Sequence, residues 1–405
     1  MYGLLGEHLS HSFSPQIHAR LGDYDYKLFE VAPDDLGAFL QAKNFNGLNV
    51  TIPYKKAVIP FLAGLSDNAR RIGAVNTIVK RADGTLWGDN TDYDGFFYMV
   101  RRSAAEVRGK KALVLGTGGA SAPVAAGLSD LGAREVIKIS RSGENNYENI
   151  ARHYDADILV NTTPVGMYPN NGKAPLSLEG FRKLSCVLDI IYNPHKTALT
   201  LDAERRGIPA FTGLSMLVAQ AKRAAELFLG TDIPDARTDE ILAELEREMQ
   251  NLVLVGMPGC GKTTVGKALS KALSRPFCDA DTEIERRAGK NIPAIFEAEG
   301  EAGFRARETA VLAELCKQSG AVIATGGGAV TISENIDILR QNSIVLFLNR
   351  DPSALPTDGR PVSQRDGVQA IYQRRLPLYR AVCDYEIDAN DAIETVVQRI
   401  SEAIQ

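Results

Sequence analysis

The chain has 405 residues, of which 44% are hydrophobic and 24% are charged, and its formal net charge is −4 at pH 7. That length is too great for one ordinary hydrophobic core, so we expect two or three domains. A small net charge without a long basic run does not favour a nucleic acid or an anionic membrane as partner.

The cysteines and the N-terminal residues indicate a cytoplasmic protein. The five cysteines are widely spaced and include no CxxC pair, which indicates neither a disulfide framework nor a zinc site. The first residues, MYGLLGEHLS, lack a basic segment and are typical of a strand. No stretch reaches the roughly 20 apolar residues of a membrane span, so no membrane partner is expected.

Short apolar strands alternate with helical patterns, which indicates an α/β protein with mostly parallel sheets. Residues 1–100, with the strands YGLLG, YKLFEV and GLNVTI, form a first α/β domain. Residues 101–213 form a doubly wound, Rossmann-type dinucleotide domain that opens on KKALVLGTGGASAPVAAGL. Two amphipathic helices over about 214–250 are expected to pack back on the first domain. Residues 251–405 then form a P-loop domain of the nucleoside-monophosphate-kinase type, which starts at NLVLVGM.

Four short strings stand out in the first hundred residues: HSFSP, GLNVTIPYK, GAVNT and GDNTDYDG. Each one alone is more typical of a turn or a solvated surface than of a site. Their polar and charged residues nevertheless include a lysine, Lys55, and a carboxylate, Asp92. A positioned ammonium can protonate an oxyanion, and a nearby carboxylate can orient it.

A glycine-rich turn, GTGGAS, follows the apolar strand of the second domain and precedes a helix. It comprises Gly116, Gly118, Gly119, Ala120 and Ser121 and predicts a dinucleotide site. The Rossmann pattern then expects an acid about 20 residues later, to bind the ribose 2′-hydroxyl. The next strand ends instead at Ser140, Arg141 and Ser142, and an arginine there suits the 2′-phosphate of NADP(H).

These strings, followed by the dinucleotide unit and by GLSMLVAQA, resemble shikimate dehydrogenase over about residues 1–250. The resemblance implies that NADPH reduces 3-dehydroshikimate to shikimate, with Lys55 and Asp92 as the catalytic pair. It implies that Ser12 and Ser14 bind the substrate carboxylate. It further implies that the remaining substrate contacts come from Asn49, Thr51, Asn76, Tyr192 and Gln220. Asn161, Thr162 and Met216 are then expected near the nicotinamide.

The second glycine-rich turn, GMPGCGKTT, matches GxxxxGK[ST] and lies between an apolar strand and a helix, as a P-loop requires. Its backbone N–H groups can surround phosphate oxygens, while Lys262 reaches the β- and γ-phosphates and Thr263 holds Mg²⁺. The predicted ATP-binding residues are Gly256, Gly259, Cys260, Gly261, Lys262, Thr263 and Thr264.

Three later strings, FCDADTEIE, GEAGFRARE and VIATGGGAV, follow in an order that resembles shikimate kinase over about residues 251–405. The resemblance implies that Arg305 and Arg380 clamp the shikimate carboxylate and that Asp281 binds ring hydroxyls and orients or deprotonates the 3-hydroxyl. Asp279 would hold Mg²⁺ through water, and the ring would lie against Gly327 and Gly328. Arg360 would stabilise the transferring phosphoryl group.

The lid segment departs from the kinase pattern. That family usually has a second arginine before the Arg-Pro pair, whereas DPSALPTDGRP has Arg360 as its one basic residue. We therefore expect weaker ATP binding than is typical of the family.

The two resemblances predict a bifunctional enzyme of chorismate biosynthesis that uses NADP(H), ATP and Mg²⁺ on small-molecule substrates. Two alternatives stay open: a dehydrogenase that prefers quinate or NAD, and an active dehydrogenase with a degenerate, regulatory or nucleotide-binding kinase module. A homodimer is also left open.

Overall fold

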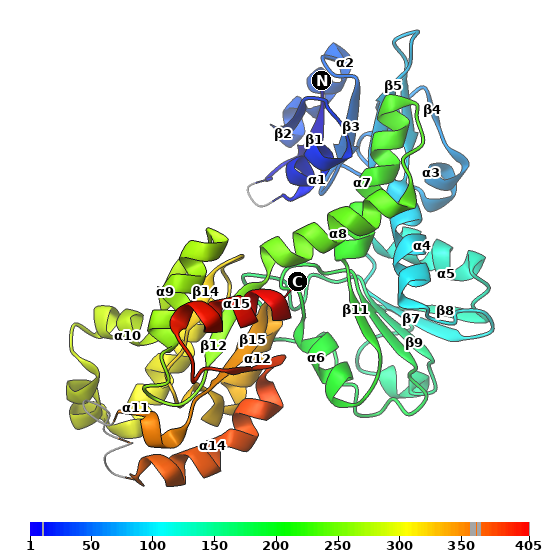
Figure 1. The fold of residues 1–405 in the computed structure, drawn as a ribbon. Coiled ribbons are helices and arrows are strands. Elements are labelled where there is room, and N and C mark those ends of the chain that lie inside the picture. The colour runs from blue at the N-terminus through cyan, green and yellow to red at the C-terminus, as the bar shows by residue number, and fades with distance from the viewer. Residues whose placement is uncertain (10–11, 357–361, 363–365, 405) are drawn as a thin grey trace. The chain divides into compact units, whose positions relative to one another are not determined.

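The computed structural model of the chain describes residues 1–9, 12–356, 362 and 366–404. The chain forms two compact units, which are described separately. The first comprises residues 1–167, 173–192 and 199–245, and the second comprises residues 168–172, 193–198 and 246–405. Figure 1 follows the chain by residue number and labels its elements.

The first hundred residues form a six-stranded mixed sheet in the order β2-β1-β3-β5-β6-β4. β1 pairs in parallel with β2 and β3, whereas β5 runs antiparallel to β3 and β6. The strands are β1 (Tyr2–Gly6), β2 (Tyr26–Glu30), β3 (Gly47–Val50), β4 (Gly64–Leu65), β5 (Thr77–Lys80) and β6 (Leu86–Asp89). The helices here are α1 (Ser14–Leu21), α2 (Leu36–Ala42), α3 (Asp67–Ile72) and α4 (Thr91–Ser103).

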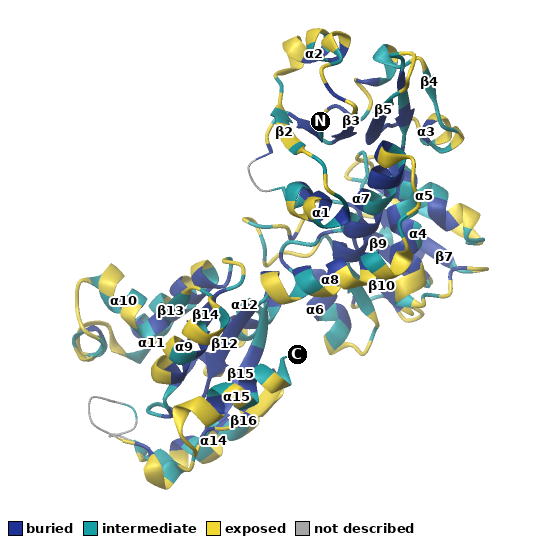
Figure 2. Ribbon diagram, turned by 45° about the horizontal axis from the view of Figure 1, so that its top comes forward, coloured by how far each residue is buried: buried dark blue, intermediate teal, exposed yellow. Residues whose placement is uncertain are grey.

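The second sheet of this unit has five strands, all parallel, in the order β11-β10-β9-β7-β8. Its strands are β7 (Lys111–Leu115), β8 (Glu135–Ile139), β9 (Ile158–Asn161), β10 (Cys186–Asp189) and β11 (Ala210–Thr212). Side chains of β7 alternate between two cores, with Val114 in one and Leu113 and Leu115 in the other. The central strands β7, β9 and β10 are therefore covered on both faces, as their dark colour in Figure 2 shows, and the sheet has the predicted Rossmann-like form.

Helices complete the first unit. They are α5 (Ser121–Asp130), α6 (Ala198–Arg205), α7 (Leu214–Leu229) and α8 (Asp235–Met249). α7 packs against α4 and α1, and its last turn meets β1, where the Tyr2 hydroxyl donates to the carbonyl oxygen of Phe228 at 2.9 Å. The Tyr2 and Phe228 rings stack with their centroids 4.8 Å apart. α7 thus returns the chain to the sheet of the first hundred residues.

The second unit is built on a five-stranded parallel sheet in the order β13-β14-β12-β15-β16. Its strands are β12 (Asn251–Val255), β13 (Phe277–Asp279), β14 (Val322–Ala324), β15 (Ser343–Asn349) and β16 (Tyr385–Asp388). Its helices are α9 (Lys262–Leu273), α10 (Ala280–Ala288), α11 (Ile292–Leu315), α12 (Ser333–Gln341), α14 (Val368–Val382) and α15 (Ile393–Ala403). β12 is buried throughout and feeds the P-loop from the middle of the sheet.

Two short stretches from earlier in the chain belong to the second unit. The Tyr168 hydroxyl donates to the carbonyl oxygen of Cys316 at 3.1 Å, and the Lys196 amide donates to that of Gln341 at 2.7 Å. The second unit is therefore not one continuous length of polypeptide.

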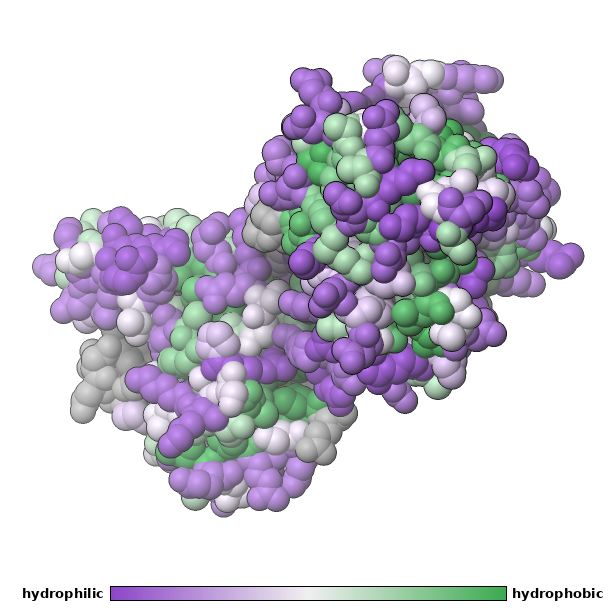
Figure 3. All heavy atoms as spheres, turned by 90° about the horizontal axis from the view of Figure 1, so that it is seen from above, coloured by the Kyte–Doolittle hydropathy of each residue, from purple (hydrophilic) through white to green (hydrophobic). Residues whose placement is uncertain are grey.

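The surface seen in Figure 3 is mostly hydrophilic, with hydrophobic residues between the polar ones. Among the helices of the described residues, none has both the length and the apolarity to cross a bilayer. The α/β class predicted for the chain, with parallel sheets and a P-loop domain, is confirmed.

Candidate active sites

The first unit contains a cavity of about 230 Å³. Its lining includes residues of β1, the end of β3, the first turn of α4 and the N-terminal half of α7. All nine residues predicted for substrate binding and catalysis in this unit line it: Ser12, Ser14, Asn49, Thr51, Lys55, Asn76, Asp92, Tyr192 and Gln220. These nine residues thus come from segments that lie far apart in the sequence.

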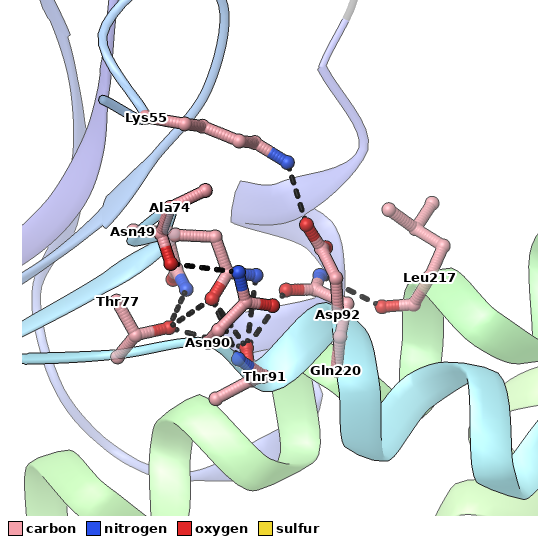
Figure 4. Close-up of polar contacts among 10 residues, drawn as sticks. Asn49, Lys55, Ala74, Thr77, Asn90, Thr91, Asp92, Leu217 and Gln220 are labelled. Carbon is pink, nitrogen blue, oxygen red and sulfur yellow. Dashed lines mark hydrogen bonds and ion pairs between the residues drawn. The ribbon is translucent and has the colours of Figure 1, made fainter. Parts of the chain in front are cut away.

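Lys55 and Asp92 form an ion pair in this cavity, with 2.6 Å between Nζ and Oδ2. Their side chains are 17% and 12% exposed, so the pair is largely removed from solvent. Figure 4 shows the lysine amine directed at the carboxylate, which is carried by the first turn of α4. An ammonium oriented in this way can donate a proton to a group bound in the cavity.

Ser12, Ser14 and Tyr192 form another part of the lining. The Ser14 amide donates to the Ser12 hydroxyl oxygen at 3.2 Å, at the N-terminus of α1. The ring of Tyr192 meets that of Phe13 edge-on, with 5.9 Å between centroids. Two hydroxyls and a helix N-terminus together suit a carboxylate.

The turn between β7 and α5 lies next to the Lys55–Asp92 ion pair. Gly116 has a φ of +101°, and a Cβ there would lie 3.1 Å from Thr162 Oγ1 and 3.0 Å from Thr163 Cγ2. A Cβ on Gly118 would face open space, whereas one on Gly119 would lie 3.6 Å from Cδ of Lys55. Backbone left uncovered before a helix N-terminus fits a pyrophosphate.

The other predicted cofactor residues fall into two groups. Ala120 and Met216 line the cavity itself. Asn161 and Thr162 are buried and held within the fold, because the Asn161 amide donates to Asp189 at 3.0 Å and Thr162 Oγ1 donates to the Leu115 carbonyl at 2.6 Å.

The loop after β8 carries Ser140, Arg141 and Ser142. The Ser140 hydroxyl donates to the Ser142 carbonyl oxygen, which closes the loop tightly. Arg141 is exposed and forms no hydrogen bond or ion pair with any residue that the structure describes. Its guanidinium is therefore available to a phosphate.

The P-loop of the second unit closes around its lysine. Gly256, Gly259 and Gly261 have φ values of +150°, +84° and +100°, which favour glycine. Lys262 is buried, and its ammonium donates to the carbonyl oxygens of Gly256 at 2.9 Å and Met257 at 3.0 Å. Cys260 is buried in the same loop, whereas Thr264 is exposed on the first turn of α9.

Thr263 and Asp279 place a hydroxyl and a carboxylate at the P-loop, within hydrogen-bonding distance of each other. The Thr263 hydroxyl donates to Asp279 Oδ2 at 2.7 Å, and Asp279 Oδ1 caps α10 by accepting from the Thr282 amide at 3.1 Å. No cluster of three or more metal-binding side chains occurs among the described residues. One hydroxyl and one carboxylate suit Mg²⁺, which takes its other ligands from water and phosphates.

Beyond the P-loop, the glycines after β14 meet charged side chains. A Cβ on Gly328 would lie 2.1 Å from an Arg305 guanidinium nitrogen, and one on Gly326 would lie 2.4 Å from Glu308 Oε1 and 3.0 Å from Asp281 Oδ1. Arg305 and Glu308 form an ion pair of 2.6 Å. A side chain at either glycine would displace the ends of these charged side chains.

Asp281 and Glu308 are carboxyl groups with perturbed titration. Burial raises the pKa of Asp281 to about 6, although the nearby Lys262 ammonium opposes the shift. Burial likewise raises the pKa of Glu308, against the attraction of Arg305. An aspartate with its pKa near neutrality is suited to accept a proton from a hydroxyl.

The structure does not bring Arg380 to this cluster, which corrects the expectation for that residue. Its guanidinium is exposed and pairs with Glu386 at 2.8 Å. Arg375, on the same helix, is buried and donates to the Gly327 carbonyl oxygen at 2.9 Å. Five residues turn a helix by about 140° from a whole number of turns, so the two arginines face different sides.

Arg360, predicted to stabilise the transferring phosphoryl group, lies outside the described residues. Sequence reasoning missed Arg375, Glu308 and the buried hydroxyls of Thr77 and Thr91. For Glu308 a signal existed, because a glutamate three residues after Arg305 shares its helix face. For Arg375 the signal was ambiguous, since RRLPLYR offers three arginines.

The fold and the two sites define a dinucleotide-dependent dehydrogenase joined to a P-loop kinase. Residues 4–78 match the family model for the shikimate dehydrogenase substrate binding domain, and residues 258–405 match that for shikimate kinase. Shikimate dehydrogenase (NADP(+)) of Clostridium beijerinckii is 37% identical over 269 residues, which cover 62% of this chain and 99% of that protein. The chain therefore belongs to the shikimate dehydrogenase family and also carries a shikimate kinase domain.

Solved structures agree with the assignment of the first unit. A chorismate mutase/shikimate 5-dehydrogenase fusion protein from Clostridium acetobutylicum matches with a TM-score of 0.58 and 37% identity, covering 60% of this chain and 96% of that chain. Shikimate 5-dehydrogenase from Thermus thermophilus, in complex with NADP(H) and shikimate, matches with a TM-score of 0.55 and 30% identity, covering 60% and 98%. The chain is thus a bifunctional enzyme of the shikimate pathway, as the two sequence resemblances predicted.

Proposed function

We propose that the first unit reduces 3-dehydroshikimate to shikimate and that the second phosphorylates shikimate to shikimate 3-phosphate. The observation that carries the first assignment is the Lys55–Asp92 ion pair in a cavity beside a glycine-rich turn. In the second, a complete P-loop occurs beside Asp281 and two arginines that can bind a carboxylate.

In the dehydrogenase, Lys55 acts on the C3 oxygen of the substrate. Bound NADPH supplies the hydride for this reaction. The Lys55 ammonium stabilises negative charge on the oxygen and donates its proton, while Asp92 holds the ammonium in place. Ser12 and Ser14 bind the carboxylate at the N-terminus of α1, and the amides of Asn49, Asn76 and Gln220 bind ring hydroxyls. Arg141 binds the 2′-phosphate of NADPH.

In the kinase, the chain positions both reactants and accepts one proton. Arg305 and Arg375 bind the shikimate carboxylate, a role that suits planar guanidinium groups. Asp281 takes the proton of the 3-hydroxyl. Lys262 leaves the P-loop carbonyls and binds the nucleotide phosphates, while Thr263 and Asp279 hold Mg²⁺, the latter through water.

One assay tests both activities together. The full chain is incubated with 3-dehydroshikimate, NADPH and Mg-ATP, and shikimate 3-phosphate is measured by mass spectrometry. Omission of ATP should leave shikimate as the product, and omission of NADPH should leave the starting ketone. Accumulation of shikimate in the complete mixture would mean that the second unit binds nucleotide without transferring phosphate.

A further inference from the structure

Three amides that line the dehydrogenase cavity are joined behind its wall by two hydroxyl groups. Thr77 and Thr91 are fully buried, and neither lines the cavity. Their hydroxyl oxygens lie 3.1 Å apart and contact Asn49, Asn76 and Gln220, as Figure 4 shows for the labelled residues. The two threonines thus form a second layer of polar groups.

Backbone groups determine which way two of the amides face. The Thr91 backbone N–H, which can only donate, meets Asn76 Oδ1 at 2.6 Å. The Leu217 carbonyl, which can only accept, meets Gln220 Nε2 at 2.9 Å. Asn76 Nδ2 therefore donates to Thr91 Oγ1 at 3.1 Å, and Gln220 Oε1 faces that same hydroxyl at 3.5 Å.

The Thr77 hydroxyl also restricts the orientation of the third amide, that of Asn49. It has a single proton, and Asn76 Oδ1 at 3.2 Å and Thr91 Oγ1 at 3.1 Å are both available to accept it. Towards Asn49 it can then only accept, which it does from Nδ2 at 3.3 Å. At the other end of Asn49, the Tyr26 hydroxyl donates to Oδ1 at 2.8 Å. A reversed Asn49 amide would compete with Asn76 Oδ1 for the single Thr77 proton and would present an N–H, in place of an acceptor, to the Tyr26 hydroxyl.

We propose that Thr77 is a positioning residue of the dehydrogenase. It holds the amide of Asn49 and contacts Oδ1 of Asn76, whose orientation the Thr91 N–H determines, so that each amide uses one N–H inside the fold and keeps the other for a hydroxyl oxygen of the substrate. This inference rests on the proposed dehydrogenase function, because it concerns how that site binds its substrate. In this arrangement the cavity presents N–H donors, and the ring hydroxyls of the substrate accept hydrogen bonds from them.

The test is Thr77→Val, which keeps the shape of the side chain and removes the hydroxyl. Shikimate oxidation with NADP⁺ is measured by steady-state kinetics on the full chain. Loss of about one oriented hydrogen bond should raise the KM for shikimate roughly 3- to 10-fold and change kcat less than about twofold. The KM for NADP⁺ should stay as in the wild type. Thr77→Ser, which restores the hydroxyl, should restore the KM for shikimate.

Thr238→Val is the matched control. Thr238 is a fully buried threonine of the same unit, and its hydroxyl has no hydrogen-bond partner among the described residues. Its removal should leave both KM values unchanged. An unchanged KM for shikimate in Thr77→Val, an equal rise in Thr77→Ser, or an equal rise in Thr238→Val would each overturn the proposal. Absence of shikimate oxidation by the wild type would instead refute the proposed function.

If Thr77→Val does not fold, Tyr26→Phe tests the same amide from its other side. This change keeps the ring that stacks on His18 with 3.9 Å between centroids, and it removes the donor to Asn49 Oδ1. The KM for shikimate should again rise while the KM for NADP⁺ does not. A folded Tyr26→Phe variant with wild-type kinetics would overturn the ordering of Asn49.

Discussion

Lys55 is the side chain on which the proposed reduction depends most. Its ammonium is the proposed proton donor of the cavity, and Asp92 holds it at 2.6 Å. Lys55→Met keeps a long apolar stem and removes the proton, so ketone reduction should fall by at least about 10²-fold. Phosphorylation of added shikimate by the same preparation should be unchanged, which serves as the control. Near-normal reduction by the variant would remove lysine from the mechanism.

Arg141 is expected to select the cofactor, because it is the exposed cation at the end of β8. Loss of a charge-assisted contact with the 2′-phosphate should raise the KM for NADPH about tenfold in Arg141→Ala. The KM for NADH, which lacks that phosphate, should change little. Equal changes for both cofactors would show that Arg141 does not bind the 2′-phosphate.

Arg375 and Arg380 form a natural matched pair on α14. Arg375→Ala should raise the kinase KM for shikimate by about tenfold or more, since a buried guanidinium facing the glycines is lost. Arg380→Ala removes only an exposed ion pair with Glu386 and should leave that KM near the wild-type value. The opposite ranking of the two variants would restore the original assignment of the carboxylate clamp to Arg380.

Residues of recognisable sequence motifs could be predicted from the sequence. Residues whose role depends on contacts between distant segments could not. Lys55 and Asp92 come from two strings whose meaning depends on their combination, and the structure brings them together. Arg375 could not be chosen over Arg380, because the linear sequence does not reveal which face of α14 packs against the rest of the unit. Thr77 and Thr91 could not be recognised either, since their role depends on contacts between β3, β5, α4 and α7.

Among the elements of the second unit, the junction of β13 and α10 sets a pH dependence. It carries Asp281, whose pKa burial raises to about 6. A general base acts only when deprotonated, so kcat/KM for shikimate should fall below about pH 6, by roughly tenfold at pH 5. A pH series of the kinase reaction at saturating Mg-ATP measures this. A rate that stays level down to pH 5 would contradict the assignment of Asp281 as the base.

Elements with local signals were the easiest to predict. The strand, turn and helix around the P-loop correspond to β12 and α9. The antiparallel strands β5 and β6 were not anticipated in detail, because their pairing with β3 depends on residues far apart in the chain. Gly300, with a φ of +69°, is non-helical and divides α11 into two helical stretches at a kink, whereas Pro377 lies inside α14 without ending it.

For the whole molecule, we predict that shikimate leaves the first site and crosses bulk solvent to the second. Only Gln250 separates α8 from β12, so the join provides no long swinging arm. The preceding sequence, EILAELEREMQ, is net acidic and would not attract an anionic intermediate. The test supplies labelled 3-dehydroshikimate with excess unlabelled shikimate. Label in shikimate 3-phosphate should be diluted in proportion to the added pool, whereas undiluted label would show direct transfer.

The interleaving of the two units has a consequence for synthesis on the ribosome. All residues of the first unit have been translated once residue 245 is reached, whereas the second unit needs residues up to the C-terminal region. Since domains tend to fold as they emerge, the first unit can close its cores while the second is still being made. Tyr168 and Lys196 must wait for Cys316 and Gln341 before their hydrogen bonds can form. The nascent chain therefore completes the enzyme that makes shikimate before the one that consumes it.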